Sequence, residues 1–248
     1  MKIAVTGSSG FIGNRLVTAL WDQGHDVVKW DNAIGRPLED FGLQGCKYVV
    51  HLAARADVRA SIENPEFYWK NNVDTTKDVQ KQCYYNRVPL IYASSSTIHN
   101  WWLSPYGTTK KANEATAFPD QIALRFTTVF GEGARESMFI SKLLSGKLEY
   151  ATNHVRDFIH VDDVVSSILD LMSIDYRLLK NAYDIGSGHG NVVSDLAKMF
   201  NPDIPIKEGD PCESHNNVAD ISDILLDSRD WKPTIDVKKY LLSRLNEV

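Results

Sequence analysis

Tyr106 and Lys110 form a Tyr-x-x-x-Lys pair that could perform acid–base chemistry. On a helix, residues four apart lie on one face, and a nearby ammonium lowers the pKa of a tyrosine from about 10 toward neutral pH. Such a phenolate can take a proton from a hydroxyl group. Ser94, Ser95 and Ser96 lie just upstream at the end of an apolar run, where open α/β sheets bind ligands. We therefore expect Tyr106 to be a catalytic base.

The Tyr-x-x-x-Lys spacing alone carries little weight, because Tyr176 and Lys180 show it too. Tyr176 follows a helical pattern and precedes a short apolar run, away from the serine cluster. We expect this second pair to lie exposed on the surface and to have no catalytic role.

Residues 6–13, TGSSGFIG, have glycines at positions 7, 10 and 13 between an apolar run and a helical pattern. The first glycine permits a tight turn, the second lets the backbone approach a pyrophosphate, and the third lets the helix pack closely on the sheet. The helix N-terminus offers free N–H groups to the anion. Asp31 ends the next apolar run, where a carboxylate binds a ribose and repels a 2′-phosphate. The pattern favours bound NAD over NADP, and the alternative is a glycine-rich turn without a ligand.

Short apolar runs alternate with longer helical patterns, and this alternation predicts an α/β fold with a doubly wound parallel sheet of the Rossmann type. Strands are expected over residues 2–6, 27–31, 48–52, 89–94, 122–125 and 182–185, and helices over residues 10–23, 74–87, 106–117, 137–145, 162–172, 193–199 and 236–245. Gly24 lies where a glycine would end the first helix.

The composition excludes several classes of protein. The 248 residues carry a net charge of −5, which argues against non-specific nucleic-acid binding. No apolar run approaches the roughly 20 residues of a membrane span, and the first residues do not resemble a signal peptide. Cys46, Cys83 and Cys212 are far apart and odd in number, so we expect no disulfide framework and no metal site. The prediction is a cytoplasmic protein without nucleic-acid or membrane partners.

Several segments, in the correct order, resemble the motifs of one family. TGSSGFIG is similar to TGxxGFIG, YGTTK to YGxSK, and LRFTTVFGEG to LRxxNVYGPG. HLAARADVRASIENPEFYWKNNV, YASSST, RDFIHVDDV, NAYDIGSGHGNVVSDLAKM and WKPTI also resemble family segments. The chain thus resembles, almost from end to end, the extended short-chain dehydrogenase/reductases, specifically the NAD-dependent nucleotide-sugar epimerase/dehydratase group.

The resemblance implies catalytic and cofactor-binding roles. Tyr106 would be the base toward a sugar hydroxyl, Lys110 would lower its pKa and hold the nicotinamide ribose, and Ser95 would hydrogen-bond the reacting hydroxyl. Ser94 and Ser96 are the alternatives for the serine. The residues implied to bind NAD are Gly7, Ser9, Gly10, Phe11, Ile12, Gly13, Asp31, Asn32, Leu52, Ala53, Ala54, Asn72, Tyr106 and Lys110.

The resemblance also implies a substrate site. Arg156 resembles the arginine that binds the substrate pyrophosphate, and Lys207 stands where relatives often carry a second arginine. The alternative for Arg156 is a surface arginine paired with Asp157 or Asp162. The residues implied to bind substrate are Arg55, Ser96, Thr97, Thr128, Arg156 and Lys207. His160, Asp162 and Asp163 are expected to be structural, because they precede a helix that they can cap.

The resemblance implies two parts and a dimer. Residues 1–131 and 156–185 would form the NAD-binding Rossmann domain, and residues 132–155 and 186–248 a small discontinuous C-terminal lobe for the substrate. Relatives pair through two helices, one with the YxxxK, so we expect a homodimer in which Tyr84 and Tyr85 are a candidate contact face. The chain is short for the group, since only 11 positions separate Ser95 from Tyr106. Trp101 and Trp102 lie in that shortened loop, either covering the ligand or packing at the surface.

The reaction is narrowed by what is absent. Family dehydratases and decarboxylases carry an acid near the catalytic serine, and this chain has Ser96 and Thr97 there. The resemblance then implies epimerisation of a nucleotide sugar, with a UDP-sugar favoured, by transient oxidation at C4 and hydride return. The alternatives are a nucleotide-sugar reductase or dehydrogenase and a non-catalytic NAD-binding protein.

Overall fold

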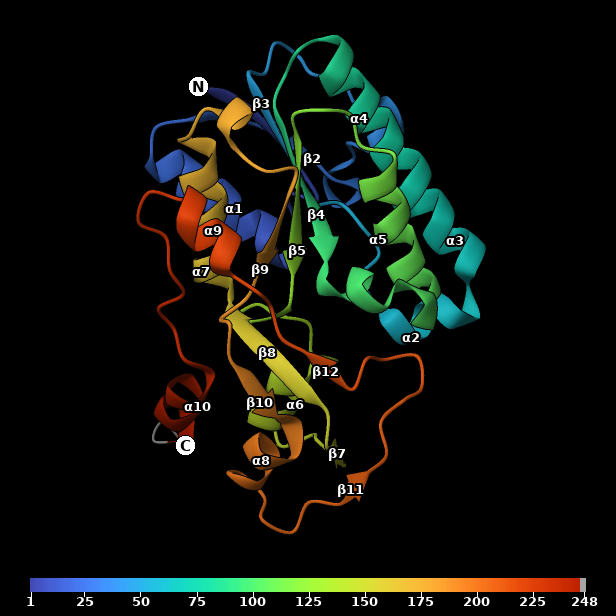
Figure 1. Ribbon diagram of the computed structural model, residues 1–248, viewed down its shortest axis with the longest axis vertical. Coiled ribbons are helices and arrows are strands. Elements are labelled where there is room, and N and C mark those ends of the chain that lie inside the picture. Colours follow the sequence, from blue (N-terminus) through green and yellow to red (C-terminus); the bar gives the residue numbers. More distant parts are fainter. Residues whose placement is uncertain (246–248) are drawn as a thin grey trace.

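The largest element is a six-stranded parallel sheet with the strand order β2-β1-β3-β4-β5-β9 (Figure 1). The computed structural model describes residues 1–245 of the chain. The strands are β1 (Lys2–Thr6), β2 (Asp26–Trp30), β3 (Tyr48–His51), β4 (Leu90–Ser95), β5 (Gln121–Phe126) and β9 (Ala182–Ile185). Their central residues are apolar and buried, as is usual for a parallel sheet covered on both faces. The expected doubly wound α/β fold is confirmed.

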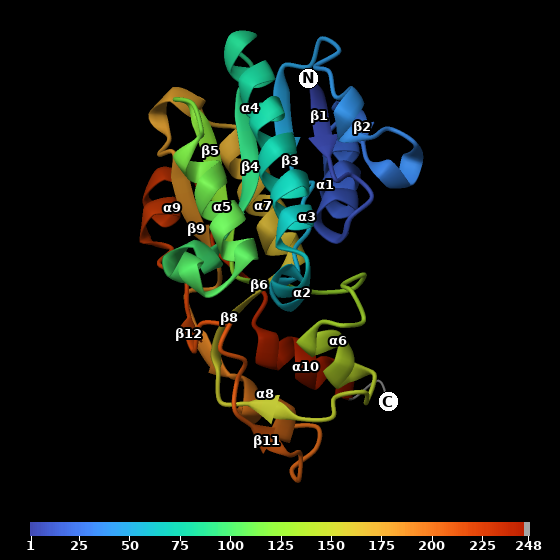
Figure 2. The same ribbon diagram turned by 90° about the vertical axis from the view of Figure 1, so that its right-hand side faces the viewer.

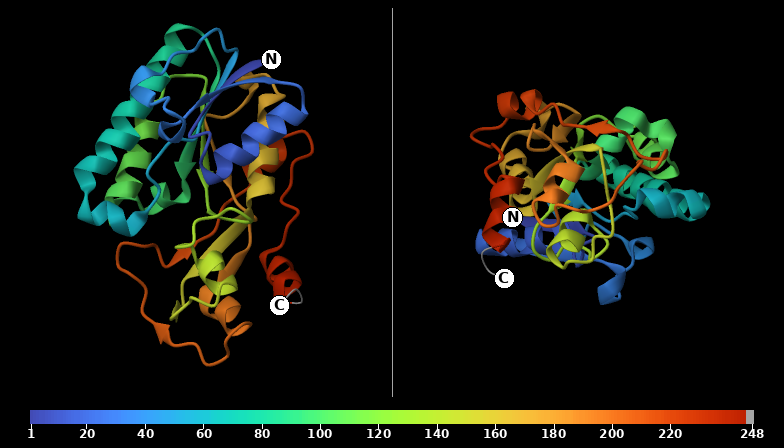
Figure 3. Two further views of the ribbon diagram at one scale, coloured as in Figure 1. Left: turned by 180° about the vertical axis from the view of Figure 1, so that it is seen from behind. Right: turned by 90° about the horizontal axis from the view of Figure 1, so that it is seen from below.

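Helices cover both faces of this sheet, as Figures 2 and 3 show. One face packs on α1 (Phe11–Asp22), α7 (Val161–Met172) and α9 (Ser222–Asp227), and the other on α4 (Thr75–Tyr85) and α5 (Pro105–Ala115). Alternate strand residues go to opposite cores: Ile3 and Val5 face α1, while Ala4 joins the core that contains Val79 and Cys83 of α4.

A smaller lobe lies beyond the carboxyl ends of the main strands (Figure 1). Its sheet contains β6 (Thr128–Phe130), β8 (Val155–His160), β10 (Gly190–Val192) and β12 (Asn216–Asn217), and a second strand pair joins β7 (Ala151–Thr152) to β11 (Ile206–Lys207). Helices α6 (Phe139–Leu144), α8 (Val193–Lys198) and α10 (Val237–Leu245) pack around a separate core that includes Phe130, Phe158 and Leu241.

The link between the two parts is made at the start of α7. His160 caps this helix, because its side chain accepts a hydrogen bond from the backbone N–H of Asp162 at 3.2 Å. The Asp163 carboxylate accepts bonds from the N–H groups of Thr234 and Ile235, at 3.1 and 3.0 Å. The structural roles expected for His160 and Asp163 are therefore confirmed. The Asp162 side chain instead pairs with Arg15 of α1 at 2.7 Å.

Some elements differ from the sequence predictions. The sequence predicted no strand at β8, and it missed α2 (Val58–Glu63), α3 (Pro65–Trp69) and a π-helical turn over Lys70–Asp74. Because β6 and β8 pair in the small sheet and α9 packs on the main core, we propose that residues 128–160 belong with the lobe and residues 222–231 with the Rossmann part. Gly24 follows α1 with φ +75°, as expected for a helix end.

The described residues contain neither a membrane-spanning helix nor a group arranged to bind a metal ion. No helix there is both long and apolar enough to cross a membrane. No group of three His, Cys, Asp or Glu side chains within residues 1–245 is arranged to hold a metal ion.

Candidate active site

Tyr106 and Ser95 meet at the carboxyl end of β4. Ser95 is the last residue of the strand, and Tyr106 lies in the first turn of α5. This helix begins where it does because Ser104 accepts a hydrogen bond from the N–H of Gly107 at 3.1 Å and Pro105 occupies the first position. The side chains of Ser95 and Tyr106 are both buried, and Ser95 acts on the Tyr106 phenol to lower its pKa.

Lys110 lies one helical turn after Tyr106 on α5. Its Nζ donates a hydrogen bond of 2.8 Å to the carbonyl oxygen of Ala93 and is 5.8 Å from the centre of the Tyr106 ring. Burial lowers the pKa of Lys110 to about 8, and the nearby Glu114 carboxylate partly opposes this change. The hydrogen bond to Ala93 thus holds the Lys110 ammonium against β4, beside the Tyr106 ring.

The pKa of Tyr106 differs in direction from the sequence prediction. Burial raises the pKa of Tyr106 to about 12, while the hydrogen bond to Ser95 and the charge of Arg135 lower it. The expected lowering by Lys110 is therefore wrong for this structure, because desolvation of the phenolate is the dominant effect. A ligand that brings positive charge to this oxygen would be needed to make Tyr106 a base near neutral pH.

The glycine loop lies directly against the end of β3. Gly7 has φ +64°, and a Cβ added there would be 2.7 Å from the backbone nitrogen of Ala53. A Cβ added at Gly13 would be 2.0 Å from the carbonyl oxygen of Gly7. Gly13 therefore lets α1 approach closely at Gly7, the residue directly after β1, as the motif predicts. The loop thus lies against Leu52 and Ala53, the residues that follow β3.

Asp31 follows β2 and binds the backbone of the glycine loop. Its carboxylate accepts hydrogen bonds from the backbone N–H groups of Ser9 and Ala33, both at 2.9 Å. Helix α1 begins at Phe11 with Gly10 as its N-cap and without a side-chain cap. The buried hydroxyl of Ser8 has no hydrogen-bond partner among the described residues. An uncapped helix N-terminus, a close glycine turn and a carboxylate at the end of β2 fit a dinucleotide such as NAD.

Asn72 is buried between the segment after β3 and helix α5. Its Oδ1 accepts a bond from the N–H of Arg55 at 2.8 Å, and its Nδ2 donates to the Arg55 carbonyl at 3.0 Å and to Thr109 Oγ1 at 3.1 Å. The side chain has no exposed surface. The cofactor contact implied for Asn72 is thus replaced by a positioning role, because its amide ties the segment after β3 to α5.

His51, the last residue of β3, is buried and contacts two threonine hydroxyls. Its Nδ1 is 2.7 Å from Thr6 Oγ1 and its Nε2 is 2.9 Å from Thr76 Oγ1. Full burial lowers the pKa of His51 to about 3. The ring is therefore neutral at physiological pH and joins β1, β3 and α4.

The residues expected to bind substrate are dispersed around the cleft. Ser96, the residue after β4, accepts a hydrogen bond from Asn217 Nδ2 at 2.8 Å. The end of β4 therefore contacts β12 of the lobe. The buried hydroxyl of Thr97 has no partner among the described residues. Thr128 begins β6, and the Lys207 ammonium lies 4.3 Å from the centre of the Tyr150 ring. Arg55 instead points at Phe67 of α3, 5.1 Å from its ring centre.

Arg156 pairs with neither Asp157 nor Asp162, which corrects the expected alternative. Its Nη2 donates to Glu213 Oε2 at 3.0 Å. Asp157 accepts bonds from the N–H groups of Ser187 and Gly188. The partner of Arg156 lies far along the chain, so no local sequence signal identified it.

Sequence reasoning missed Arg135 near the reacting atoms. The charge of Arg135 lowers the pKa of Tyr106, and its Nη2 donates to the Ala56 carbonyl at 3.0 Å. Arg135 lies two positions after the family-like segment LRFTTVFGEG, and this short distance was the available signal.

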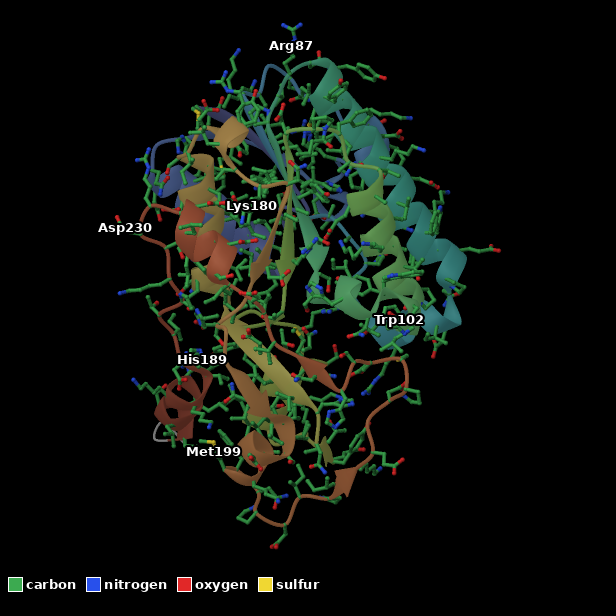
Figure 4. The ribbon with its side chains drawn as sticks, in the orientation of Figure 1. Arg87, Trp102, Lys180, His189, Met199 and Asp230 are labelled. Carbon is green, nitrogen blue, oxygen red and sulfur yellow. The ribbon has the colours of Figure 1, made fainter. Side chains whose placement is uncertain are left out.

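The second Tyr–Lys pair and the tryptophans lie away from these residues. Lys180 binds Asp223 of α9 at the surface, and Figure 4 labels it beside that helix. Trp102, also labelled in Figure 4, is 61% exposed. It lines a groove of about 480 Å³ with Ile62 of α2 and Trp69 of α3.

Comparisons with known proteins identify the family. The model of the NAD dependent epimerase/dehydratase family matches residues 3–186. The chain belongs to this family. Protein CapI of Staphylococcus aureus is 32% identical, with 69% of each chain covered. The putative UDP-glucose 4-epimerase of Methanocaldococcus jannaschii is 26% identical, with 98% of this chain and 97% of that protein covered.

Solved structures of this family have the same fold. MoeE5 in complex with UDP-glucose and NAD is 28% identical with a TM-score of 0.85, and the alignment covers 99% of this chain and 98% of that one. The alignment to the Methanocaldococcus protein spans 301 positions, more than the 248 residues here, so this family member carries deletions.

Proposed function

We propose that this protein is an NAD-dependent 4-epimerase of a UDP-sugar. The observation that carries the proposal is that Ser95, Tyr106 and Lys110 lie together at the edge of the sheet that also carries the glycine loop. The names of the Methanocaldococcus relative and of MoeE5 with UDP-glucose and NAD support a UDP-sugar substrate.

The cofactor would lie along the glycine loop, with its pyrophosphate at the α1 N-terminus and a ribose at Asp31. When bound, NAD supplies a hydride acceptor and donor for the sugar carbon. Ser95 Oγ would hold the C4 hydroxyl, and Tyr106 Oη would take its proton and later return it. Lys110 would contribute positive charge and bind the nicotinamide ribose. Oxidation of this carbon and its reduction from the other face would invert C4.

The residues beside Ser95 favour epimerisation over elimination. Ser96 and Thr97 carry hydroxyl groups, and an elimination would need an acid near this position to protonate the leaving hydroxyl. The reaction then needs no net oxidant, since the cofactor is regenerated in each cycle.

A UDP-hexuronate is the second candidate substrate, and Arg135 is the observation that favours it. The charge of its guanidinium acts on Tyr106, and we infer that Arg135 faces the bound sugar. Arginine recognises carboxylates with paired hydrogen bonds. MoeE5 is also known in complex with UDP-glucuronic acid and NAD, at 27% identity, and a relative of Thermodesulfobacterium geofontis that is 29% identical is a UDP-glucuronate 4-epimerase.

The test is proton NMR of the anomeric region after incubation with NAD and UDP-hexoses or UDP-hexuronates. The proposal expects a new C4 epimer without accumulation of reduced cofactor. Accumulation of reduced cofactor with one oxidised product would favour a dehydrogenase instead.

The homodimer through α4 and α5 stays a prediction, and Tyr85 near the end of α4 is 73% exposed.

A further inference from the structure

Glu213 joins two arginines from different parts of the fold. Its Oε1 accepts a hydrogen bond from Arg59 Nε at 2.9 Å, and its Oε2 accepts one from Arg156 Nη2 at 3.0 Å. Arg59 lies on α2, which packs beside α5, whereas Arg156 lies on β8 of the lobe. One carboxylate therefore bridges the two sides of the cleft, and we name residues 208–217, which contain it, the strap.

Arg156 uses nearly all its hydrogen-bonding capacity within the lobe, and its partners Glu213 and Ser214 belong to the strap. Nη1 donates to the carbonyl oxygens of Ser214 at 2.7 Å and Val155 at 3.1 Å, and Nη2 also contacts His154 Nδ1 at 3.0 Å. The Arg156 side chain is 13% exposed. Without movement of the strap, this guanidinium has no free pair of N–H groups for another anion.

The surroundings of Glu213 are cationic. Arg59 lies 3.8 Å from Asp210 and also interacts with the Tyr150 hydroxyl, and the Lys207 ammonium lies over the same tyrosine ring. Three cations thus gather at one place in the cleft. Two guanidinium groups that share one carboxylate are also spaced to share a diphosphate, because both anions offer several oxygens to planar N–H pairs.

The other end of the strap reaches the catalytic strand. Asn217 Nδ2 donates to Ser96 Oγ at 2.8 Å, and Ser96 directly follows Ser95. Figures 1 and 2 show this part of the chain running along the lobe, from β11 at its far end to β12 near the main sheet. The strap therefore runs from the arginine pair to the site of the proposed chemistry.

The resemblance already implies that Arg156 binds the substrate diphosphate. We propose that Arg59 shares this site and that Glu213 fills it until a diphosphate displaces it. The inference rests on the proposed function, which makes the substrate a nucleotide sugar. Displacement of Glu213 releases the strap from Arg59 and opens the cleft beside Ser96. The fraction of molecules with the strap released then limits the apparent affinity, which the internal carboxylate lowers.

The test compares diphosphate binding to full-length variants by isothermal titration calorimetry. The probes are inorganic diphosphate and UDP, with NAD at saturation so that the glycine loop does not take up the probe. Glu213→Gln is expected to bind both probes about fivefold or more tightly than the unchanged protein. Glu208→Gln removes the same charge from the same strap and is expected to stay within about twofold. Circular dichroism melting confirms that each variant is folded.

Equal or weaker diphosphate binding by Glu213→Gln would overturn the proposal, since it would make Glu213 a structural strut that orients Arg156. Binding that tightens as much in Glu208→Gln would also overturn it, because general charge would explain the effect. Adding Arg59→Gln to Glu213→Gln is expected to reverse the gain. If only the proposed function is wrong, no UDP-sugar is epimerised, yet inorganic diphosphate still binds Glu213→Gln more tightly.

Discussion

Lys110 Nζ donates a hydrogen bond of 2.8 Å to the carbonyl oxygen of Ala93, two residues before Ser95 on β4. A second bond, 2.5 Å from Ser94 Oγ to Glu114, ties the same strand to the same helix. These two contacts fix α5, which carries Tyr106, against the end of β4, which carries Ser95. The proposed acid–base pair is therefore positioned by the protein itself.

Tyr106→Phe should lower kcat by about a hundredfold or more, because it removes the proton acceptor while keeping the ring. Binding of NAD, measured by calorimetry, should change little. Tyr176→Phe is the matched control, since this tyrosine has the same spacing to a lysine but lies away from β4, and it should keep full activity. Normal turnover by Tyr106→Phe would rule out the assigned base.

Protein stability should fall in acid because of His51. Its folded-state pKa is lowered to about 3, so between this value and the ordinary value of about 6.5 the unfolded state binds more protons than the folded state. The free energy of unfolding contributed by this group is complete above the unfolded pKa and declines as the pH falls. Linkage predicts a loss of about 2 kcal/mol between pH 7 and pH 5.

His51→Gln isolates this contribution, because glutamine can still contact the two threonine hydroxyls but does not titrate. The free energies of unfolding at pH 7 and pH 5, measured with urea, should differ by about 2 kcal/mol less in this variant than in the unchanged protein. His189→Gln, at an exposed histidine labelled in Figure 4, should keep the full pH dependence. An unchanged difference in His51→Gln would mean that other groups cause the acid loss.

Gly13→Ala should lower the free energy of unfolding by about 2 kcal/mol or more and weaken NAD binding, because the new methyl group would meet the Gly7 carbonyl oxygen at 2.0 Å. Gly42→Ala is the control, since its Cβ would have no neighbour within 4 Å. Urea unfolding and calorimetry measure both effects. Equal stability of the two variants would show that the loop shifts to accept the methyl group.

Arg135→Gln should separate the two candidate substrates. If a hexuronate carboxylate binds Arg135, kcat/KM for the UDP-hexuronate should fall about tenfold or more, with an effect below about threefold on a UDP-hexose. Arg135→Lys should restore part of the loss, because it keeps the charge without the paired N–H groups. Equal losses on both substrates would instead indicate that Arg135 acts through Tyr106.

The Rossmann part could be predicted from the sequence because its strands are continuous apolar runs and its glycine loop has a fixed order of parts. The lobe could not be predicted in this way. Its strands β7 and β11 have two residues each, too few for a periodic pattern, and β8 lies within a segment read only as a family motif. Residues 51–73 resemble one family segment, and this resemblance does not indicate the two short helices α2 and α3 within them.

The site was predicted in part for a similar reason. Residue type and order indicated Tyr106 and Lys110, because their spacing is local. The direction of the Tyr106 pKa depends on burial, and the partner of Arg156 lies 57 positions away, so neither follows from local pattern. Glu213 could be recognised only after the chain had brought α2, β8 and the strap together.

The most direct measurement is the fate of the hydrogen on C4 during turnover. The protein would be incubated with NAD and a UDP-sugar that carries deuterium at C4, and the products followed by NMR and mass spectrometry. The proposed mechanism predicts the C4 epimer with deuterium retained at C4, because the hydride leaves and returns within one site. Loss of the label to solvent, or accumulation of reduced cofactor in place of the epimer, would contradict it.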